Sequence, residues 1–171
     1  MHEQFMRLAL AQAAQSGSDV PVGAVIVRDG QVIASAHNER EAQDSPLAHA
    51  EMLAMERACR ALYTRRLSGC TLYVTLEPCP MCAGAMVMAQ LDGCVFGAYD
   101  ARQGCCGSVY DLPHDPAFFH RVPCAGGVLE NDCARLLRAF FERRRGDNAP
   151  SLYRMPRRFA NRAGHENVSG L

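Results

Sequence analysis

The sequence contains no lysine, so arginine supplies all 18 of its strongly cationic side chains. It also contains no apolar run near the roughly 20 residues that a membrane-spanning helix requires. The N-terminal segment 1–15 lacks the basic start, the long apolar centre and the small-residue cleavage site of a signal peptide. These absences argue against membrane contact and lead us to expect a soluble cytoplasmic protein.

The cysteine content argues against a disulfide framework. Nine cysteines are an odd number, and no signal peptide pattern accompanies them. We therefore expect reduced thiols, some of them metal ligands. Five cysteines stand singly among apolar or small residues, a setting typical of buried thiols that act as small hydrophobic side chains: Cys59, Cys70, Cys94, Cys124 and Cys133.

The formal net charge is zero, but the charges are unevenly distributed along the chain. Residues 1–134 carry nine arginines against 15 acidic residues, whereas residues 135–171 carry nine arginines against three. A basic segment attached to an acidic body is a common arrangement for contacting phosphate. A solvated helix end followed by a disordered tail produces the same pattern. The charge alone does not decide between these two interpretations.

The length of 171 residues suits one domain and is too short for two. Periodicity and turn residues predict these elements in order: a helix at 2–15, a hairpin around Asp29-Gly30, a helix at 48–63, a strand at 71–76, a helix at 80–90, a strand at 94–99, a loop at 100–120, a strand at 121–125 and a helix at 131–145. This order predicts a three-layer α/β/α fold with one mixed five-stranded sheet. The folded domain is expected to cover 1–146. An Arg-rich, flexible tail is expected over 147–171, where Asp, Asn, Pro, Arg and Gly predominate.

Two short motifs carry metal-ligand chemistry, His49-Ala50-Glu51 and Pro78-Cys79-Pro80-Met81-Cys82. One histidine and two thiolates provide three ligands for tetrahedral Zn²⁺ and leave the fourth position open to water. A closed structural site would need a fourth ligand at similar spacing, and no second Cys-x-x-Cys or His-x-x-x-His pair occurs. The pattern predicts one catalytic Zn²⁺ per subunit, held by His49, Cys79 and Cys82.

Both motifs lie where helices are predicted to begin. His49 and Glu51 can converge only at the entry to a first helical turn, because residues i and i+2 diverge in mid-helix. Two helix N-termini would then direct their unpaired N–H groups at the metal and offset its anionic ligands. Zinc does not need Glu51 as a ligand, so the predicted role of Glu51 is that of a catalytic proton shuttle for the water at the metal.

Each motif has a simpler interpretation when it is taken alone. A single histidine such as His49 is more often packed or exposed, and a lone Cys-x-x-Cys can be a redox pair. The two motifs together, in this order and spacing, favour the metal. His-x-Glu followed by Pro-Cys-x-x-Cys is the known signature of zinc-dependent nucleobase deaminases, whose known members include a bacterial tRNA adenosine deaminase.

Several longer stretches resemble the bacterial tRNA-specific adenosine deaminase family: PVGAVIV, HN at 37–38, AHAEMLAM, TLYVTLEPCPMCAGAMVMA, VFGAYDARQGCCGSVYDL and HRV. The similarity covers residues 3–145. It implies a cytidine deaminase-like fold, a homodimer, and conversion of the wobble adenosine of a tRNA anticodon to inosine. It also implies substrate contacts at matching positions: Asn38, Val22, Ala50, Pro78, Asp100 and His120. Phe119, Arg143 and Arg144 are further candidate substrate contacts.

The resemblance implies a distinct role for most of these positions. Asn38 would hydrogen-bond the flipped base or its ribose, although asparagine also often caps a turn. Asp100 would contact the target or a neighbouring nucleotide, although a plain loop aspartate fits the position as well. Val22 and Pro78 would wall the pocket. The backbone N–H groups near Ala50 and Cys79 would help to hold the oxygen at the metal.

A few positions depart from the family pattern. Phe119-His120-Arg121 stands where relatives commonly have Asn-His-Arg, so stacking on a flanking base would replace a polar contact, at roughly 1–3 kcal/mol per base. Cys105-Cys106 stands where small residues are usual, and Tyr99 precedes Asp100 where arginine is frequent. The Arg-rich helix end at 143–145 supports RNA contact. The arginines at 154–162 lie beyond the resemblance.

Three functions are consistent with the sequence. The first is deamination of the wobble adenosine in a tRNA anticodon. The second is deamination of a free base or nucleoside such as guanine, cytosine or cytidine, by the same zinc chemistry. The third is a catalytically inactive RNA-binding or structural zinc module, which would have no use for Glu51. Zinc and a glutamate serve adenine and cytosine equally, so the choice of adenine rests on the resemblance.

Overall fold

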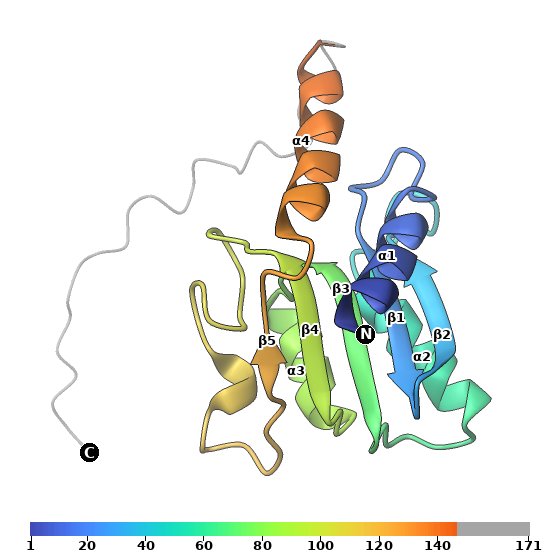
Figure 1. Cartoon of the computed structure of the whole chain (residues 1–171), viewed down its shortest axis with the longest axis vertical. Helices are drawn as coiled ribbons and strands as arrows, with labels where there is room; N and C mark the ends of the chain where they lie inside the picture. Colours follow the sequence, from blue (N-terminus) through green and yellow to red (C-terminus); the bar gives the residue numbers. More distant parts are fainter. Residues whose placement is uncertain (147–171) are drawn as a thin grey trace, which may run out of the picture.

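The computed structural model describes residues 1–146 (Figure 1). The tail predicted over 147–171, with its arginines, lies outside the described residues. The elements are α1 (His2–Ala13), β1 (Gly23–Arg28), β2 (Gln31–His37), α2 (Ala50–Ala61), β3 (Cys70–Leu76), α3 (Pro80–Met88), β4 (Gly93–Ala98), the 3₁₀ helix η1 (Leu112–His114), β5 (Cys124–Ala125) and α4 (Glu130–Gly146). The predicted order of elements is confirmed.

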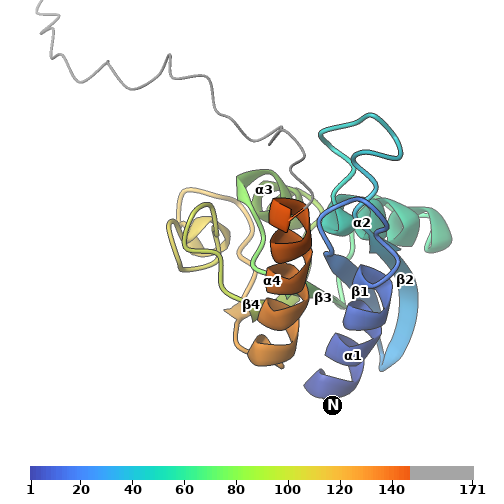
Figure 2. The ribbon, with the colours of Figure 1, turned by 90° about the horizontal axis from the view of Figure 1, so that it is seen from above.

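The strands form one mixed sheet in the order β2-β1-β3-β4-β5. The β1 strand pairs antiparallel with β2 and β3, whereas β3–β4 and β4–β5 are parallel. Figure 2 shows α1 and α4 on one face of the sheet and α2 and α3 on the other. The three-layer α/β/α fold predicted from the sequence is therefore confirmed. In the part of the chain that the structure describes, no helix is long and apolar enough to cross a membrane.

The central strands β1, β3 and β4 are buried on both faces, which explains why their sequences are nearly continuous apolar runs. Successive side chains of a strand point to opposite faces. Accordingly, Ala24 and Ile26 of β1 belong to the core beneath α2 and α3, and Val25 and Val27 belong to the core beneath α1 and α4. Gly23 lets α1 approach this strand, because a Cβ there would lie 2.0 Å from the carbonyl oxygen of Ala9.

Local chemistry sets the ends of most elements. Asp29 and Gly30 both have positive φ, 51° and 74°, as a two-residue hairpin turn of the primed type requires. The predicted fifth strand at 121–125 shortens to Cys124–Ala125. Pro123 has no N–H to donate to a ladder, and the Val122 N–H bonds to the Pro113 oxygen at 3.0 Å.

Candidate metal centre and active site

The starts of α2 and α3 meet at the end of the sheet where β2 and β3 finish. His49 is the residue before α2, with φ −75° and ψ 149°, and Cys79 is the residue before α3, with φ −73° and ψ 173°. Both backbones are extended, so each side chain projects ahead of its helix beside unpaired N–H groups. Pro80 then occupies the first turn of α3, where its missing N–H costs nothing. The predicted placement of both motifs at helix starts is confirmed.

The three predicted ligands converge. The Nδ1 atom of His49 lies 3.7 Å from Sγ of Cys79 and 3.6 Å from Sγ of Cys82. Zn–N bonds of about 2.0–2.1 Å and Zn–S bonds of about 2.3 Å at a tetrahedral angle would place these atoms about 3.6 Å apart. All three ligand atoms lie within 4.8 Å of one another, and residues 1–146 hold no other such group. The donor set and its spacing fit zinc.

The two thiols share their protons unequally. A hydrogen bond from Cys82 lowers the pKa of Cys79 to about 4, against the opposing effect of burial. The anion so formed, together with burial, raises the pKa of Cys82 far above its ordinary value. The hydrogen bond to Cys79 also raises the pKa of His49. A dication that bound here would displace the proton from Cys82, because zinc ligands bind deprotonated.

Glu51 lies in the first turn of α2 and is only 3 % exposed. Its Oε2 atom is buried and has no hydrogen-bond partner among the described residues. Burial raises the pKa of this carboxyl, and the nearby His49 opposes the shift. Buried polar atoms without partners are rare and are a feature of functional sites. The protein therefore keeps one carboxyl oxygen beside the metal ligands without a structural bond.

Asn38 is buried and connects the end of β2 to the start of α2. Its Oδ1 accepts the Ala50 N–H at 2.9 Å, and its Nδ2 donates to the Val20 oxygen at 3.0 Å. The first bond engages the N–H of Ala50, which was expected from the sequence to point at the oxygen on the metal. In this structure Asn38 therefore performs the capping role that was weighed as its alternative. A contact of Asn38 with the substrate stays a prediction.

Val22, Pro78 and Asp100 lie at the same end of the sheet. The Val22 oxygen accepts the Asn38 N–H at 3.0 Å, and both Val22 and Pro78 are buried. Asp100 follows β4, and its Oδ1 accepts the N–H of Arg102 at 2.9 Å. Its side chain thus shapes its own turn while remaining partly exposed. The pocket-wall and nucleotide contacts implied for these residues stay predictions.

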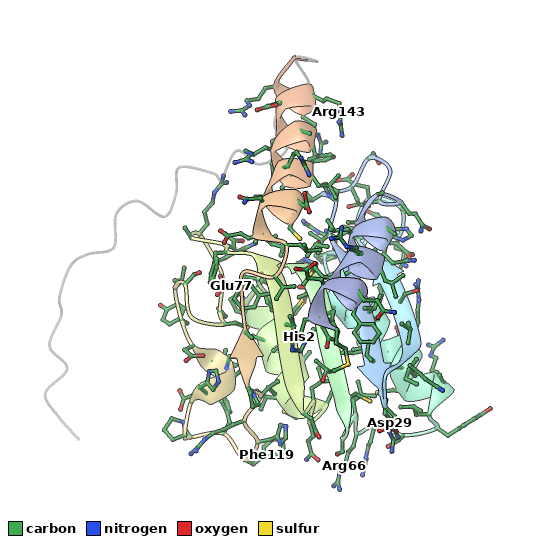
Figure 3. The ribbon with its side chains drawn as sticks, in the orientation of Figure 1. His2, Asp29, Arg66, Glu77, Phe119 and Arg143 are labelled. Atoms are coloured by element: carbon green, nitrogen blue, oxygen red, sulfur yellow. The ribbon has the colours of Figure 1, made fainter. Side chains whose placement is uncertain are left out.

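Phe119 and His120 lie away from the metal ligands. The Nε2 atom of His120 is 2.7 Å from the Leu91 oxygen, which precedes the start of β4, whereas the metal ligands lie beyond the other end of the sheet. The six residues of β4 separate the two ends by about 20 Å. Figure 3 shows Phe119 and Arg143 on opposite sides of Glu77, the residue that follows β3. The substrate contacts implied for Phe119 and His120 therefore stay predictions, and within one chain both residues lie at the end of the sheet opposite the metal ligands.

Arg143 and Arg144 occupy the exposed last turn of α4, which extends past the end of the sheet that carries the metal ligands (Figure 3). The guanidinium carbon of Arg144 lies 5.4 Å from the ring centre of Phe140, so its stem packs on the helix while its charge stays accessible. No role was predicted from the sequence for Glu77, which is buried beside this end of the sheet. The one feature of the sequence that could have drawn attention to Glu77 is its position as an acidic residue between an apolar strand and Pro78.

Comparison with known proteins agrees with this geometry. Residues 1–98 match the family model of the cytidine and deoxycytidylate deaminase zinc-binding region. A tRNA-specific adenosine deaminase of Bacillus subtilis is 49% identical over 141 residues, which cover 81% of this chain and 88% of the relative. The chain belongs to the tRNA-specific adenosine deaminase family. Its cytidine deaminase-like fold follows from the same matches.

Solved structures extend the comparison of this family member. A structure from a study of A-to-I editing by tRNA:A34 deaminases at the wobble position of transfer RNA has a TM-score of 0.76 and 40% identity. The match covers 78% of this chain and 99% of that one. A guanine deaminase from Bacillus subtilis has a TM-score of 0.58 and 30% identity, with 85% and 94% of the two chains covered. Members of this wider fold thus include enzymes named for a free base.

Proposed function

We propose that this chain is a zinc-dependent hydrolytic deaminase that converts adenosine to inosine at the wobble position of a tRNA anticodon. The observation that carries the proposal is the convergence of His49, Cys79 and Cys82 beside the unpartnered carboxyl oxygen of Glu51. A structural zinc module would have no use for that carboxyl. The 49% identity to a tRNA-specific adenosine deaminase supports the choice of substrate.

The reaction adds water across the C–N bond of the base and releases ammonia, so it needs a nucleophile and a proton carrier. When bound by the three ligands, zinc supplies Lewis acidity that makes water nucleophilic near neutral pH. Glu51 accepts a proton as the water attacks, and it delivers protons to the ring nitrogen and to the departing amine. The N-termini of α2 and α3 place positive dipole ends beside the anionic thiolates and offset their charge.

The cationic end of α4 supports RNA as the substrate. Arg143 and Arg144 are exposed in the last turn of α4, which extends past the end of the sheet that holds the metal ligands (Figure 3). Arginine binds phosphate in a planar, bidentate geometry, and phosphate contacts position a nucleic acid without reading its sequence. Asn38 and Asp100 are the residues proposed to contact the flipped nucleotide, with Val22 and Pro78 as apolar walls.

Deamination of a free base is the second candidate, since the Bacillus subtilis guanine deaminase shares the fold at 30% identity. A small-molecule enzyme would close its pocket over the whole substrate and would not need a basic helix end. The exposed arginines of α4 therefore favour the RNA substrate over this alternative.

We also propose a homodimer that forms through the outer surface of α2 and α3. A shallow hollow of about 290 Å³ lies between these helices, and its apolar lining comes from Met52, Met55, Cys59, Ala85, Met88 and Ala89. Met88 is 69 % exposed in the single chain and belongs to this apolar lining, so the two helices present a contiguous apolar surface. Sedimentation equilibrium of the wild type and of Met88→Glu tests the proposal, because a charge there would weaken the dimer. The cytoplasmic location predicted from the sequence stays a prediction.

The substrate is tested with purified protein and an anticodon stem-loop that bears a wobble adenosine. Parallel reactions contain free adenosine, cytidine and guanine, and nucleoside digestion followed by mass spectrometry identifies the products. Inosine from the stem-loop alone supports the proposal. Turnover of a free base or nucleoside alone would preserve the zinc chemistry and overturn the RNA substrate.

A further inference from the structure

Glu77 carries a buried carboxylate. All of its hydrogen-bond donors belong to one segment that is distant from it in the sequence. Glu77 follows β3 directly, two residues before Cys79, and is 2 % exposed. Its Oε1 accepts the N–H groups of Cys106 and Ser108, each at 3.0 Å. Its Oε2 accepts the Asp100 N–H at 3.0 Å and the hydroxyl of Ser108. The four donors belong to the segment 100–108, which follows β4.

These bonds compensate a costly burial. Taking a carboxylate out of water is unfavourable unless donors replace the lost hydration. No arginine or histidine forms an ion pair with Glu77 among the described residues, so backbone N–H groups and one hydroxyl provide the compensation. Such converging N–H groups form an anion-binding concavity. Here the anion is the Glu77 carboxylate of the same chain, and the segment 100–108 wraps around it.

Two further contacts fit the segment closely to the strand that leads to the metal ligands. The Cys105 N–H donates to the Pro78 oxygen at 2.9 Å. A Cβ on Gly104 would lie 2.3 Å from Oε2 of Glu77, so only glycine permits this approach. The segment 100–108 is therefore attached at Glu77 and at Pro78, both within two residues of the ligand Cys79.

Asp100 connects this arrangement to the substrate. Its N–H is bound by Glu77, while its Oδ1 accepts the Arg102 N–H, so both ends of the residue are oriented. We propose that Glu77 is a positioning residue, a buried anion that holds the segment 100–108, and Asp100 with it, against the metal-binding turn so that the site accepts the RNA around the target adenosine. This inference rests on the proposed function.

The variant Glu77→Gln tests the inference in the full-length zinc-loaded protein. Glutamine keeps one oxygen for Cys106 and Ser108, but its NH₂ group faces the Asp100 N–H, and two donors repel. Because the Asp100 N–H loses its acceptor and the segment 100–108 is held less firmly, the KM for the stem-loop should rise about tenfold or more. The zinc content and kcat should change little. Ser108→Ala removes one donor of the four and should raise KM in the same direction by a smaller factor.

Asp115→Asn is the matched control. It makes the same carboxylate-to-amide change at an exposed turn of the following loop, where Oδ1 accepts the Ala117 N–H at 2.8 Å. Its KM should equal that of the wild type. The double variant Glu77→Gln/Asp100→Ala should be no worse than Asp100→Ala alone, because residues that act through one another are not additive. An unchanged KM in Glu77→Gln, or fully additive losses, would overturn the positioning role.

Amide hydrogen exchange separates this inference from the proposed function. Exchange at Asp100, Cys106 and Ser108 should be faster in Glu77→Gln than in the wild type, and it should be unchanged in Asp115→Asn. This measurement needs no substrate. If the wild type fails to deaminate the stem-loop, the proposed function fails while the exchange result still decides whether Glu77 holds the segment. Equal exchange in Glu77→Gln and the wild type would contradict the inference.

Discussion

The Oδ1 atom of Asn38 accepts the backbone N–H of Ala50 at 2.9 Å, so the residue after β2 caps the helix that begins between His49 and Glu51. His49 and Glu51 flank Ala50 on either side. The Nδ2 atom of Asn38 donates at the same time to the Val20 oxygen at 3.0 Å. One buried amide therefore sets the position of both functional side chains relative to the sheet.

Replacing Asn38 with alanine should destabilise the protein. The change leaves the Ala50 N–H and the Val20 oxygen unpaired in the interior, which costs about 1–3 kcal/mol per group. Urea denaturation measures the loss. Asn38→Asp keeps the acceptor for Ala50 but sets a buried carboxylate oxygen against the Val20 oxygen, so it should be destabilised as well. Asn131→Ala, the same truncation at an exposed position of α4, is the control and should keep a midpoint close to that of the wild type. A wild-type midpoint in Asn38→Ala would contradict the capping role.

Removing one thiolate should remove the metal. Elemental analysis of Cys82→Ala should find much less zinc than the value of about one per chain expected of a three-ligand site. Cys94→Ala is the matched control, because Cys94 is an equally buried thiol in the core beneath α2 and α3. It should retain full zinc. Equal zinc in the two variants would remove Cys82 from the ligand set.

Chelation should lower the thermal stability of the wild type. A metal that binds only the folded chain stabilises it by about 2.7 kcal/mol at a hundredfold excess over its dissociation constant. Differential scanning calorimetry before and after dialysis against a chelator should show this loss in the wild type. The transition of Cys82→Ala should not respond. A chelator effect of the same size in both would indicate that the stabilising metal binds elsewhere.

The arginines of α4 should govern the salt dependence of RNA binding. Converting Arg143 and Arg144 to alanine should weaken stem-loop binding and reduce the slope of log K against log salt by about one unit for each phosphate that is no longer neutralised. The double variant Arg28→Ala/Arg66→Ala removes the same charge at the opposite end of the sheet, where β1 ends and where Figure 3 labels Arg66. This variant should leave the slope unchanged. Equal slopes in the two double variants would mean that the arginines of α4 do not contact phosphate.

Phe119 should be dispensable for catalysis. It is 66 % exposed and lies at the end of the sheet opposite the metal ligands, so truncation to alanine removes neither core packing nor a contact with the site. Its kcat/KM for the stem-loop should stay close to the wild-type value. A loss of tenfold or more, equal to about 1.4 kcal/mol, would mean that the RNA reaches this end, for example across a dimer.

Local patterns predicted the metal centre well because the chemistry is encoded locally. The spacing of Cys79 and Cys82 and the Pro80 between them already specify a strand-to-helix transition, and both thiols lie at that transition in the structure. The same holds for the hairpin, whose turn requires the positive φ that Asp29 and Gly30 adopt. Each of these features is decided by residues within one or two turns of chain.

The long loop after β4 was not predictable in the same way. Its course depends on the buried carboxylate of Glu77, a contact across 23 to 31 positions of sequence that no periodicity records. The position of Phe119 was likewise not predictable, because the resemblance supplied a residue match without the path of this chain. The stacking implied for this residue stays a prediction. The shortening of β5 had a visible cause in Pro123, whose missing N–H ends the ladder.

The most direct test of the catalytic site compares the wild type with Glu51→Gln in water enriched in oxygen-18. We expect the wild type to convert the wobble adenosine of the stem-loop to inosine that carries one oxygen-18 atom. Glu51→Gln should bind zinc as fully as the wild type and yield almost no inosine. Inosine without the label, or undiminished turnover by zinc-loaded Glu51→Gln, would contradict a hydrolysis in which Glu51 carries the proton.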